Sequence, residues 1–267
     1  MSQTTMPRSM ESFVTCALLI EVTIVRDDAT SFCPKTGKLE VMLTPRRLTI
    51  SVIALTCVVA FMTWQVVGYE WFAQADFRAV QTARRLVPDK GIFRFTVNLG
   101  LRGLLLTVFL PTLAWVSWKR QSWVPLIGFA IILVFETGMA GAMKLAIGRE
   151  LPWQSWPLMG RLETGELGFP SGHATNVPAL IGYMVWFFTA PGTTRRRAGW
   201  ILVTVIAVVV NISSWLIRTH WPTDLYAGNA LGVIALVTVI AFMNASGLSP
   251  WATVPQTTED LRETVDG

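Results

Sequence analysis

Cysteine, histidine and charged residues are all scarce in this chain of 267 residues. The three cysteines, Cys16, Cys33 and Cys57, are an odd number without CxxC spacing, which argues against a disulfide framework and against a zinc site. Charged residues make up only 15% of the sequence, whereas hydrophobic residues make up 52% and the mean hydropathy is +0.49. Because soluble domains carry more charge, the composition predicts a membrane protein.

Tryptophan, by contrast, is abundant, with twelve residues against three tyrosines. An indole ring has an apolar body and a single N–H group, so it is typical of the interface between lipid and water. The net charge of +5 does not indicate nucleic-acid binding, because the basic residues lie in short scattered groups rather than on one aromatic-rich face. We interpret these groups as signals of membrane topology.

Six apolar stretches are long enough, or nearly long enough, to cross a bilayer, which takes about 20 helical residues. They are residues 48–67, 103–118, 123–143, 175–190, 199–217 and 225–244. The sequence therefore predicts an all-α polytopic membrane protein built as a bundle of six transmembrane helices. An even number of spans places both termini on the same side of the membrane.

Three groups of basic residues lie at alternate ends of these stretches. They are Arg46 with Arg47, Lys119 with Arg120, and Arg195 to Arg197. By the positive-inside rule, the connections that carry them, and both termini, are cytoplasmic. In a bacterial-type inner membrane the connections 144–174 and 218–224 then face the periplasm or exterior. Residues 71–86, in another outward connection, are expected to form a helix on the outer interface.

The segments outside the predicted bundle divide the chain into three parts. Residues 1–41 hold an apolar run too short to span a membrane and no signal-peptide pattern, so a poorly ordered extension is expected. Met42 opens the sequence MLTPRR ahead of the first span, and N-terminal sequencing would decide whether translation starts there. Residues 42–246 are expected to form the membrane domain, and residues 247–267 a polar tail.

The two histidines of the chain each lie between an apolar stretch and an outward connection. His173 ends the sequence Pro-Ser-Gly-His, and His220 precedes Asp224 by four residues. A carboxylate at that spacing can fix the tautomer of an imidazole and leave its other nitrogen free as a nucleophile or base. Asp224 also fits the cap of a following helix, and the two roles are compatible.

The segment around His173 offers groups that suit an anion. Ser171 supplies a hydroxyl beside the unpaired backbone N–H groups of a helix N-terminus, and Gly172 lets an oxygen approach the backbone. Lys144 and Arg149 add positive charge on the same outward side, although either residue alone would equally fit a membrane-interface anchor. Together these groups predict a phosphate site.

These residues resemble the motifs of the type 2 phosphatidic acid phosphatase (PAP2) family, which shares its histidine chemistry with vanadium haloperoxidases. The three motifs of that family read K-x6-R-P, P-S-G-H and S-R-x5-H-x3-D. The second is intact here, but Leu151 replaces the arginine of the first and Ser214 replaces the arginine of the third. Arg149 and Arg218 lie nearby in sequence and are candidates to supply the missing positive charges.

The resemblance implies a membrane lipid phosphatase with the six-helix fold of the PAP2 family. It implies that His220 attacks phosphorus to form a phosphohistidine, that Asp224 orients His220, and that His173 protonates the leaving oxygen. The phosphate oxygens would be bound by Lys144, Ser171 and the amide of Gly172. Such a mechanism needs no metal and no other cofactor, since phosphoryl transfer depends chiefly on positioning and electrostatic stabilisation.

The expected partners are membrane lipid and a lipid phosphate substrate, such as undecaprenyl diphosphate, phosphatidic acid, phosphatidylglycerol phosphate or a lipid A phosphate. The sequence selects none of the four and leaves the oligomeric state open. One alternative is a catalytically silent protein that binds lipid phosphates, and another is a lipid-to-lipid phosphotransferase. A transporter that couples protons through Glu136, an acid inside the third stretch, is a further alternative, although a structural role for Glu136 is favoured.

Overall fold

The computed structural model describes residues 45–68, 71–87, 91–152 and 167–251. The chain divides into two compact units, Met1–Glu40 and Val41–Gly267, and the described residues all belong to the second. The predictions made for residues 1–41, for a start at Met42 and for most of the tail therefore lie outside the described residues.

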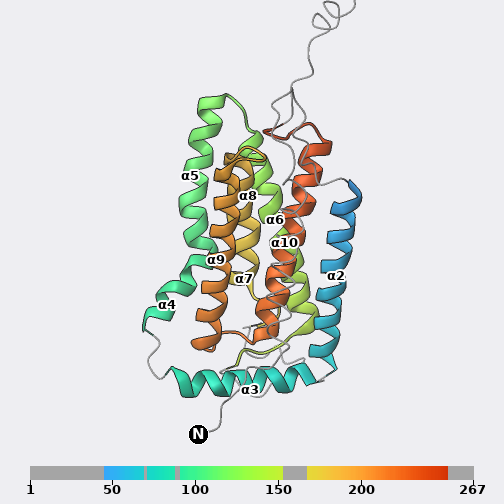
Figure 1. Ribbon diagram of the computed structural model, residues 1–267, viewed down its shortest axis with the longest axis vertical. Coiled ribbons are helices and arrows are strands. Elements are labelled where there is room, and N and C mark those ends of the chain that lie inside the picture. Colours follow the sequence, from blue (N-terminus) through green and yellow to red (C-terminus); the bar gives the residue numbers. More distant parts are fainter. Residues whose placement is uncertain (1–44, 69–70, 88–90, 153–166, 252–267) are drawn as a thin grey trace, which may run out of the picture. The chain divides into compact units, whose positions relative to one another are not determined.

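The described chain is built almost entirely from helices (Figure 1). They are α2 (Pro45–Val67), α3 (Trp71–Leu86), α4 (Gly91–Val97), the 3₁₀ turn η1 (Asn98–Gly100), α5 (Arg102–Arg120), α6 (Val124–Ile147), α7 (Gly172–Asn176), the π-helical turn η2 (Val177–Ile181), α8 (Gly182–Phe188), α9 (Thr194–Leu216) and α10 (Pro222–Ala245). The predicted all-α class is confirmed. Each of the six predicted stretches coincides with helix to within a few residues.

Four of the described helices, α2, α6, α9 and α10, are long and apolar enough to cross a membrane on their own. The segments Gly91–Gly100 and Arg102–Arg120, bent by 47° at their junction, make a fifth span if the pair counts as one. The remaining predicted span, the fourth along the chain, is the run α7–η2–α8. It is shorter than the others and interrupted by a π-helical turn that contains Pro178, as is typical of a local break in a helix.

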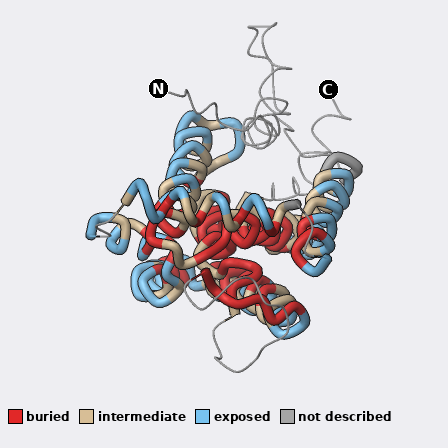
Figure 2. The backbone as a smooth tube through the Cα atoms, turned by 90° about the horizontal axis from the view of Figure 1, so that it is seen from below, coloured by how far each residue is buried: buried red, intermediate tan, exposed pale blue. Residues whose placement is uncertain are grey.

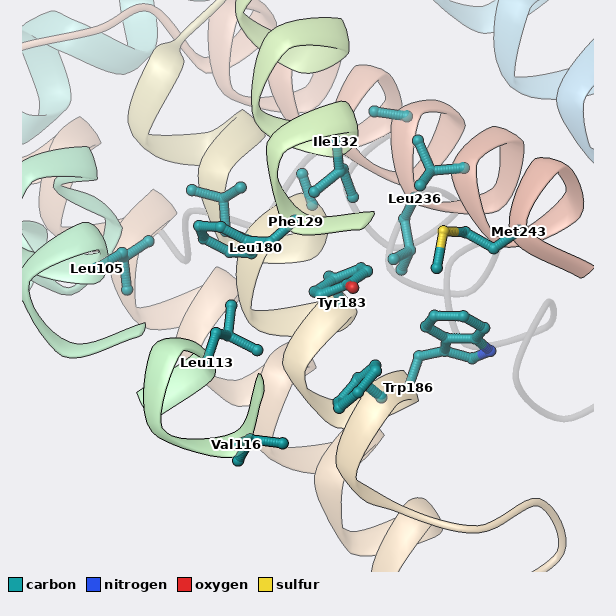
Figure 3. Packing of buried hydrophobic residues seen from close by; sticks show 14 residues of the cluster. Leu105, Leu113, Val116, Phe129, Ile132, Leu180, Tyr183, Trp186, Leu236 and Met243 are labelled. Atoms are coloured by element: carbon teal, nitrogen blue, oxygen red, sulfur yellow. The ribbon is translucent and has the colours of Figure 1, made fainter. Parts of the chain in front are cut away.

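The middle of the described bundle is α8 with its neighbours. Tyr183 of α8 lies in one buried cluster with Phe129 of α6, Leu113 of α5 and Met243 of α10 (Figure 3). The rings of Phe129 and Tyr183 lie 5.7 Å apart. The outer faces of the helices are exposed (Figure 2). The exposed residues include many large apolar side chains, as a lipid-facing surface requires. In lipid, close packing rather than exclusion of water holds helices together.

Two glycines bring α10 against α7. A Cβ on Gly228 would lie 2.6 Å from the carbonyl oxygen of Ser171, and one on Gly232 would lie 2.3 Å from that of Thr175. This spacing of small residues allows two helix backbones to approach closely. The segment that carries His173 is thereby held against the helix that begins beside His220.

Helix α3 runs across one end of the bundle (Figure 1). It is fastened to the end of α9 by Trp215, whose indole N–H donates to the carbonyl of Ala79 over 3.0 Å. The prediction of a helix at residues 71–86 is confirmed. Its apolar side chains divide between the two sides, since Val80 is buried within the protein, whereas Leu86 is 61% exposed.

The basic residues Arg195 to Arg197 were expected in a connection but lie in the first turn of α9. The reason is a local cap, because the hydroxyl of Thr193 accepts a hydrogen bond from the backbone N–H of Arg196 over 3.2 Å. Arg196 also donates to the carbonyl of Trp186, and Arg120 lies over the ring of Phe187. Two of the basic groups thus meet at the end of α8 that is remote from His173.

Candidate active site

His220 lies in the short connection between α9 and α10, with Asp224 in the first turn of α10. One oxygen of Asp224, Oδ2, accepts a hydrogen bond from the backbone N–H of Trp221 over 3.1 Å and lies 3.4 Å from Nδ1 of His220. Asp224 therefore both caps α10 and orients the imidazole. Because Nδ1 faces the carboxylate, Nε2 is the nitrogen left for chemistry.

His173, the second residue of α7, faces His220 across the site, with the ring centroids 6.5 Å apart. The two segments are joined by a hydrogen bond from the backbone N–H of Ser171 to the carbonyl of Asp224, over 3.0 Å. The expectation that both histidines meet at one end of the bundle is therefore met by the geometry. A phosphoryl group held between the rings would be within reach of both.

Ser171 and Gly172 stand at the N-terminus of α7. The buried hydroxyl of Ser171 accepts a hydrogen bond from the backbone N–H of Ala174 over 3.4 Å, which leaves its own hydrogen free to donate. A Cβ on Gly172 would meet no other atom within 4 Å, so the space beside its amide is open. Both groups are placed where an oxyanion at the helix N-terminus would be bound.

Lys144 lies in the last turn of α6 and donates to the backbone carbonyl of Leu167. An ammonium group has three N–H donors, so this bond leaves two for another acceptor. Helix α6 ends at Gly148, whose φ of 63° is in the left-handed region that glycine adopts without strain. The chain then turns inward, and Arg149 is carried into the protein.

Arg149 is only 1% exposed, and its guanidinium group binds two carboxylates. Nη1 donates to Oδ1 of Asp224 over 2.6 Å, and Nη2 donates to Oδ2 of Asp76 over 2.7 Å. The guanidinium group also lies over the ring of Trp221, 5.1 Å from its centroid. Arg149 was suggested by the sequence as a phosphate ligand, but both of its amino groups bind carboxylates of the protein.

Asp76, on the buried face of α3, was not singled out from the sequence. Its carboxylate binds Arg149 and accepts hydrogen bonds from both the backbone N–H and the hydroxyl of Thr223. Burial raises the pKa of Asp76, the positive charge of Arg149 lowers it, and the nearby negative charge of Asp224 raises it further. The net result is a raised pKa. Burial alone lowers the pKa of Arg149, but the charges of Asp224 and Asp76 outweigh it and raise the pKa.

One sequence signal points to Asp76. It falls on the same helical face as three buried apolar residues of α3, namely Ala73, Val80 and Ala83. A lone carboxylate on an apolar stripe is costly to bury unless it is paired. That pattern alone predicts a buried cation as its partner, but it does not say which one.

The positions of the two missing family arginines hold buried residues without charge. Leu151 is buried, and so is Ser214, whose hydroxyl has no hydrogen-bond partner among the described residues. Neither position can supply a cation to the site. Any compensating charge must therefore come from elsewhere in the chain.

Arg218 is the second residue after the end of α9, following the cap residue Ile217, and has a left-handed conformation with φ of 65°. Its N–H donates to the carbonyl of Trp215, and that of Thr219 donates to the carbonyl of Ser214, each over 3.0 Å. This pair of bonds is the Schellman motif, which favours glycine at the position of Arg218. A side chain there costs on the order of 1 kcal/mol, and such strain is frequently kept at functional sites.

Glu136, inside α6, is fully buried and pairs with Arg102 of α5 over 3.1 Å. Nη2 of Arg102 also donates to the side-chain oxygen of Asn176 over 3.4 Å. The sequence favoured a structural role for Glu136, and the structure supplies a cation for it from neighbouring α5. Arg102 was not recognised from the sequence, because it is one of several arginines in a long connection.

Among the described residues, no group of three His, Cys, Asp or Glu side chains is placed to hold a metal ion. The expectation that no metal or cofactor is needed stays a prediction. A surface hollow at the opposite end is lined by Arg120, Phe187 and Pro250 among others, with no histidine or carboxylate. The candidate site is the end with the histidines, because within the described residues a candidate nucleophile, its carboxylate partner and a second imidazole meet there.

Comparison with known proteins gives one family, one relative and one solved structure. The model of the PAP2 superfamily matches residues 125–248. Phosphatidylglycerophosphatase B of Bacillus subtilis (strain 168) is 28% identical over 150 residues, which are 54% of this chain and 70% of that protein. The crystal structure of a transmembrane PAP2 type phosphatidylglycerolphosphate phosphatase from Bacillus subtilis matches with a TM-score of 0.62 at 21% identity, covering 73% of this chain and 96% of that one. This structural match concerns the fold.

Proposed function

We propose that this chain, whose residues 125–248 match the model of the PAP2 superfamily, is an integral membrane phosphatase that hydrolyses a lipid phosphate or diphosphate through a phosphohistidine on His220. The observation that carries the proposal is the pair of imidazoles 6.5 Å apart, one of them held by Asp224. This is the arrangement that a nucleophile and a general acid require on either side of a phosphoryl group.

In the first step, Nε2 of His220 attacks phosphorus and the bond from phosphorus to the lipid oxygen breaks. Asp224 stays bound at Nδ1, where its negative charge stabilises the positive charge that the imidazole gains. His173 donates a proton to the leaving oxygen, so the dephosphorylated lipid departs neutral at that oxygen. In the second step, water attacks the phosphohistidine while His173 takes up a proton from it, and inorganic phosphate leaves.

The phosphate oxygens are bound by the ammonium group of Lys144, the hydroxyl of Ser171 and the amide of Gly172. Donors aimed at these oxygens stabilise the charge that spreads over them in the transition state. Arg149 serves differently in this proposal, as a positioning residue. It fixes the oxygen of Asp224 that does not face His220, and it thereby holds the carboxylate in line with the nucleophile.

Arg218 is proposed as a phosphate-binding residue that replaces the arginine missing at Ser214. We expect Arg218→Gly to raise the KM for the lipid phosphate about tenfold, because a charge-assisted contact is lost. The same change should raise the midpoint of thermal unfolding, because glycine relieves the left-handed strain. Steady-state kinetics and thermal unfolding of purified protein check the two effects. A glycine variant with unchanged KM contradicts the role in binding.

The active site is proposed to face the periplasm or exterior. Support comes from Arg120 and Arg196, which lie at the end of the bundle remote from the histidines, where the positive-inside rule expects the cytoplasm. Among the four expected substrates, we propose phosphatidylglycerol phosphate first, because the names of the similar proteins describe enzymes for that lipid. Its acyl chains can stay in the bilayer while the phosphate reaches the histidines.

The test is phosphate release by detergent-purified protein from a panel of phosphatidylglycerol phosphate, phosphatidic acid, undecaprenyl diphosphate and a lipid A phosphate. We expect release that orthovanadate inhibits, fastest from phosphatidylglycerol phosphate. Folded protein that releases phosphate from no lipid would instead favour the silent lipid-binding alternative. Loss of substrate with a newly phosphorylated lipid, and without inorganic phosphate, would identify a phosphotransferase.

A further inference from the structure

Arg102 is a cation within the bundle for which the catalytic steps have no use. It lies at the first residue of α5, directly after the 47° bend that separates α5 from the segment Gly91–Gly100. Its partner Glu136 lies two helical turns before Lys144 in α6, on the side toward the interior of the bundle. An ion pair at such depth is costly and frequently functional, so it calls for an explanation.

The backbone beside Arg102 is locked to α7. A Cβ on Gly100 would lie 2.7 Å from the carbonyl oxygen of His173, so only glycine allows this approach. The carbonyl of Gly100 accepts a hydrogen bond from the amide of Asn176 over 2.9 Å. Asn176 follows His173 by nearly one helical turn, and Arg102 binds it from the other side. Arg102 is thus held about one turn deeper than the catalytic imidazole.

The guanidinium group of Arg102 is anchored at one amino group only. Nη2 binds Glu136 and Asn176, whereas Nε has no hydrogen-bond partner among the described residues. The side chain is 35% exposed, in contrast to the fully buried Glu136. Its charge acts on both His173 and Lys144, so it lies within electrostatic reach of the phosphate site. Nε is buried, but Nη1 makes no hydrogen bond to the described residues, so its two N–H donors are available to a ligand beside that site.

The flank around Arg102 is exposed and apolar, as a surface in contact with lipid is. Leu101 and Leu104 are exposed apolar residues, and a Cβ on Gly103 would meet nothing within 4 Å. A lipid that enters here with its chains in the bilayer presents its headgroup first to Arg102 and then, further out, to the histidines. A phosphate near the chains and a second phosphate at the outer end would match these two levels.

We propose that Arg102, held by Glu136 and Asn176, binds a second phosphate group of the substrate, the one nearer the lipid chains, and so selects lipids that carry two phosphate groups in series. The inference rests on the proposed phosphatase function and names its substrate class. Both phosphatidylglycerol phosphate, with a phosphodiester behind its terminal phosphate, and undecaprenyl diphosphate belong to this class, whereas phosphatidic acid does not. An arginine suits the task, because its planar fork binds phosphate oxygens in pairs.

The competing explanation is that Arg102 only neutralises Glu136. The two are separated by comparing Glu136→Gln with the double variant Arg102→Gln, Glu136→Gln, since neither leaves a buried carboxylate unpaired. Arg94→Gln is the matched control, because it removes the same charge from an exposed position on neighbouring α4. For each protein we would measure kcat and KM with phosphatidylglycerol phosphate and with phosphatidic acid, and the inhibition constant of orthovanadate.

Relative to Glu136→Gln, the double variant should lose roughly 10- to 100-fold in kcat/KM for phosphatidylglycerol phosphate, the range expected for one arginine contact to phosphate. Its kcat/KM for phosphatidic acid and its inhibition by orthovanadate should stay within about threefold, because neither ligand has a second phosphate. The single variant Arg102→Lys keeps Glu136 and a positive charge opposite it. Its preference for phosphatidylglycerol phosphate over phosphatidic acid should fall less than that of the double variant. It serves as the second variant if the double variant folds poorly.

Four results would overturn the inference. If the double variant has the same kcat/KM as Glu136→Gln for each of the two lipids, Arg102 is only a counter-ion of Glu136. A parallel loss with both lipids and with orthovanadate would place Arg102 on the reacting phosphate instead. If the wild-type protein prefers phosphatidic acid, the proposed selectivity for lipids with two phosphate groups is wrong, whereas the proposed phosphatase function still stands. Wild type that releases phosphate from neither lipid nor from undecaprenyl diphosphate would refute the proposed function as well.

Discussion

Replacing His220 with alanine is expected to lower phosphate release from the preferred lipid by at least about 10⁴-fold, the scale seen when an enzyme loses its nucleophile. The reason is geometric. Nε2 of His220 is the only imidazole nitrogen near the site that Asp224 supports from the opposite side of the ring. The chain should still fold, because the carboxylate of Asp224 keeps its bonds to Arg149 and Trp221.

His173→Ala is the matched control for this prediction. It should slow release from a lipid, whose alkoxide needs a proton, far more than from para-nitrophenyl phosphate, whose leaving group does not. His220→Ala should be inactive with both substrates. Brief exposure to radiolabelled substrate should leave acid-labile label on wild type and on the His173 variant. Turnover by His220→Ala close to the wild-type rate would refute the assignment of the nucleophile.

Replacing Arg149 with methionine is expected to lower the free energy of unfolding by about 3–5 kcal/mol, the usual cost of breaking a buried ion pair from one side. The change would leave Asp76 and Asp224 facing each other without a cation. Because burial and the neighbouring charge already raise the pKa of Asp76, that carboxyl should then take up a proton on folding. Stability of the variant should therefore fall as the pH rises through the folded pKa of Asp76.

Thermal unfolding in detergent measures this effect, with Arg84→Met on the exposed face of α3 as the control. Adding Asp76→Asn to the Arg149 variant should recover part of the loss, because one of the two unpaired charges is removed. A different result would restore the role that the sequence first suggested. If Arg149→Met unfolds like wild type but binds orthovanadate much more weakly, Arg149 is a phosphate ligand and not a positioning residue.

The membrane helices could be located from the sequence because the bilayer constrains each one separately. A span must be about 20 residues long and apolar, and this can be read from any single stretch. The exception shows the limit of that logic. The run α7–η2–α8 begins at Gly172, and its regular α-helix is interrupted at Val177–Ile181. This run lies at the centre of the bundle, where it contacts other helices rather than lipid. A count of apolar residues does not reveal such a turn.

The candidate site was predictable only where its residues are close in sequence. His220 and Asp224 are four residues apart at the start of a helix, and Ser171 to His173 open another, so local geometry already relates them. The residues that the sequence did not reveal, Asp76 and Arg102, reach the site from α3 and α5. Nothing in their local surroundings states which charge each will meet.

From the sequence alone follow the helical, membrane-bound character of the chain and the position of its spans, and the sequence predicts that the two histidines lie in one site. The contacts of Arg149 with Asp224 and Asp76, and the pairing of Arg102 with Glu136, became known only from the packing of the helices. Apolarity and helix capping can be read from the sequence because they act between neighbours along the chain. The partner of a buried charge depends on which helices pack together. Close packing is possible here because glycines such as Gly100, Gly228 and Gly232 let two backbones approach each other.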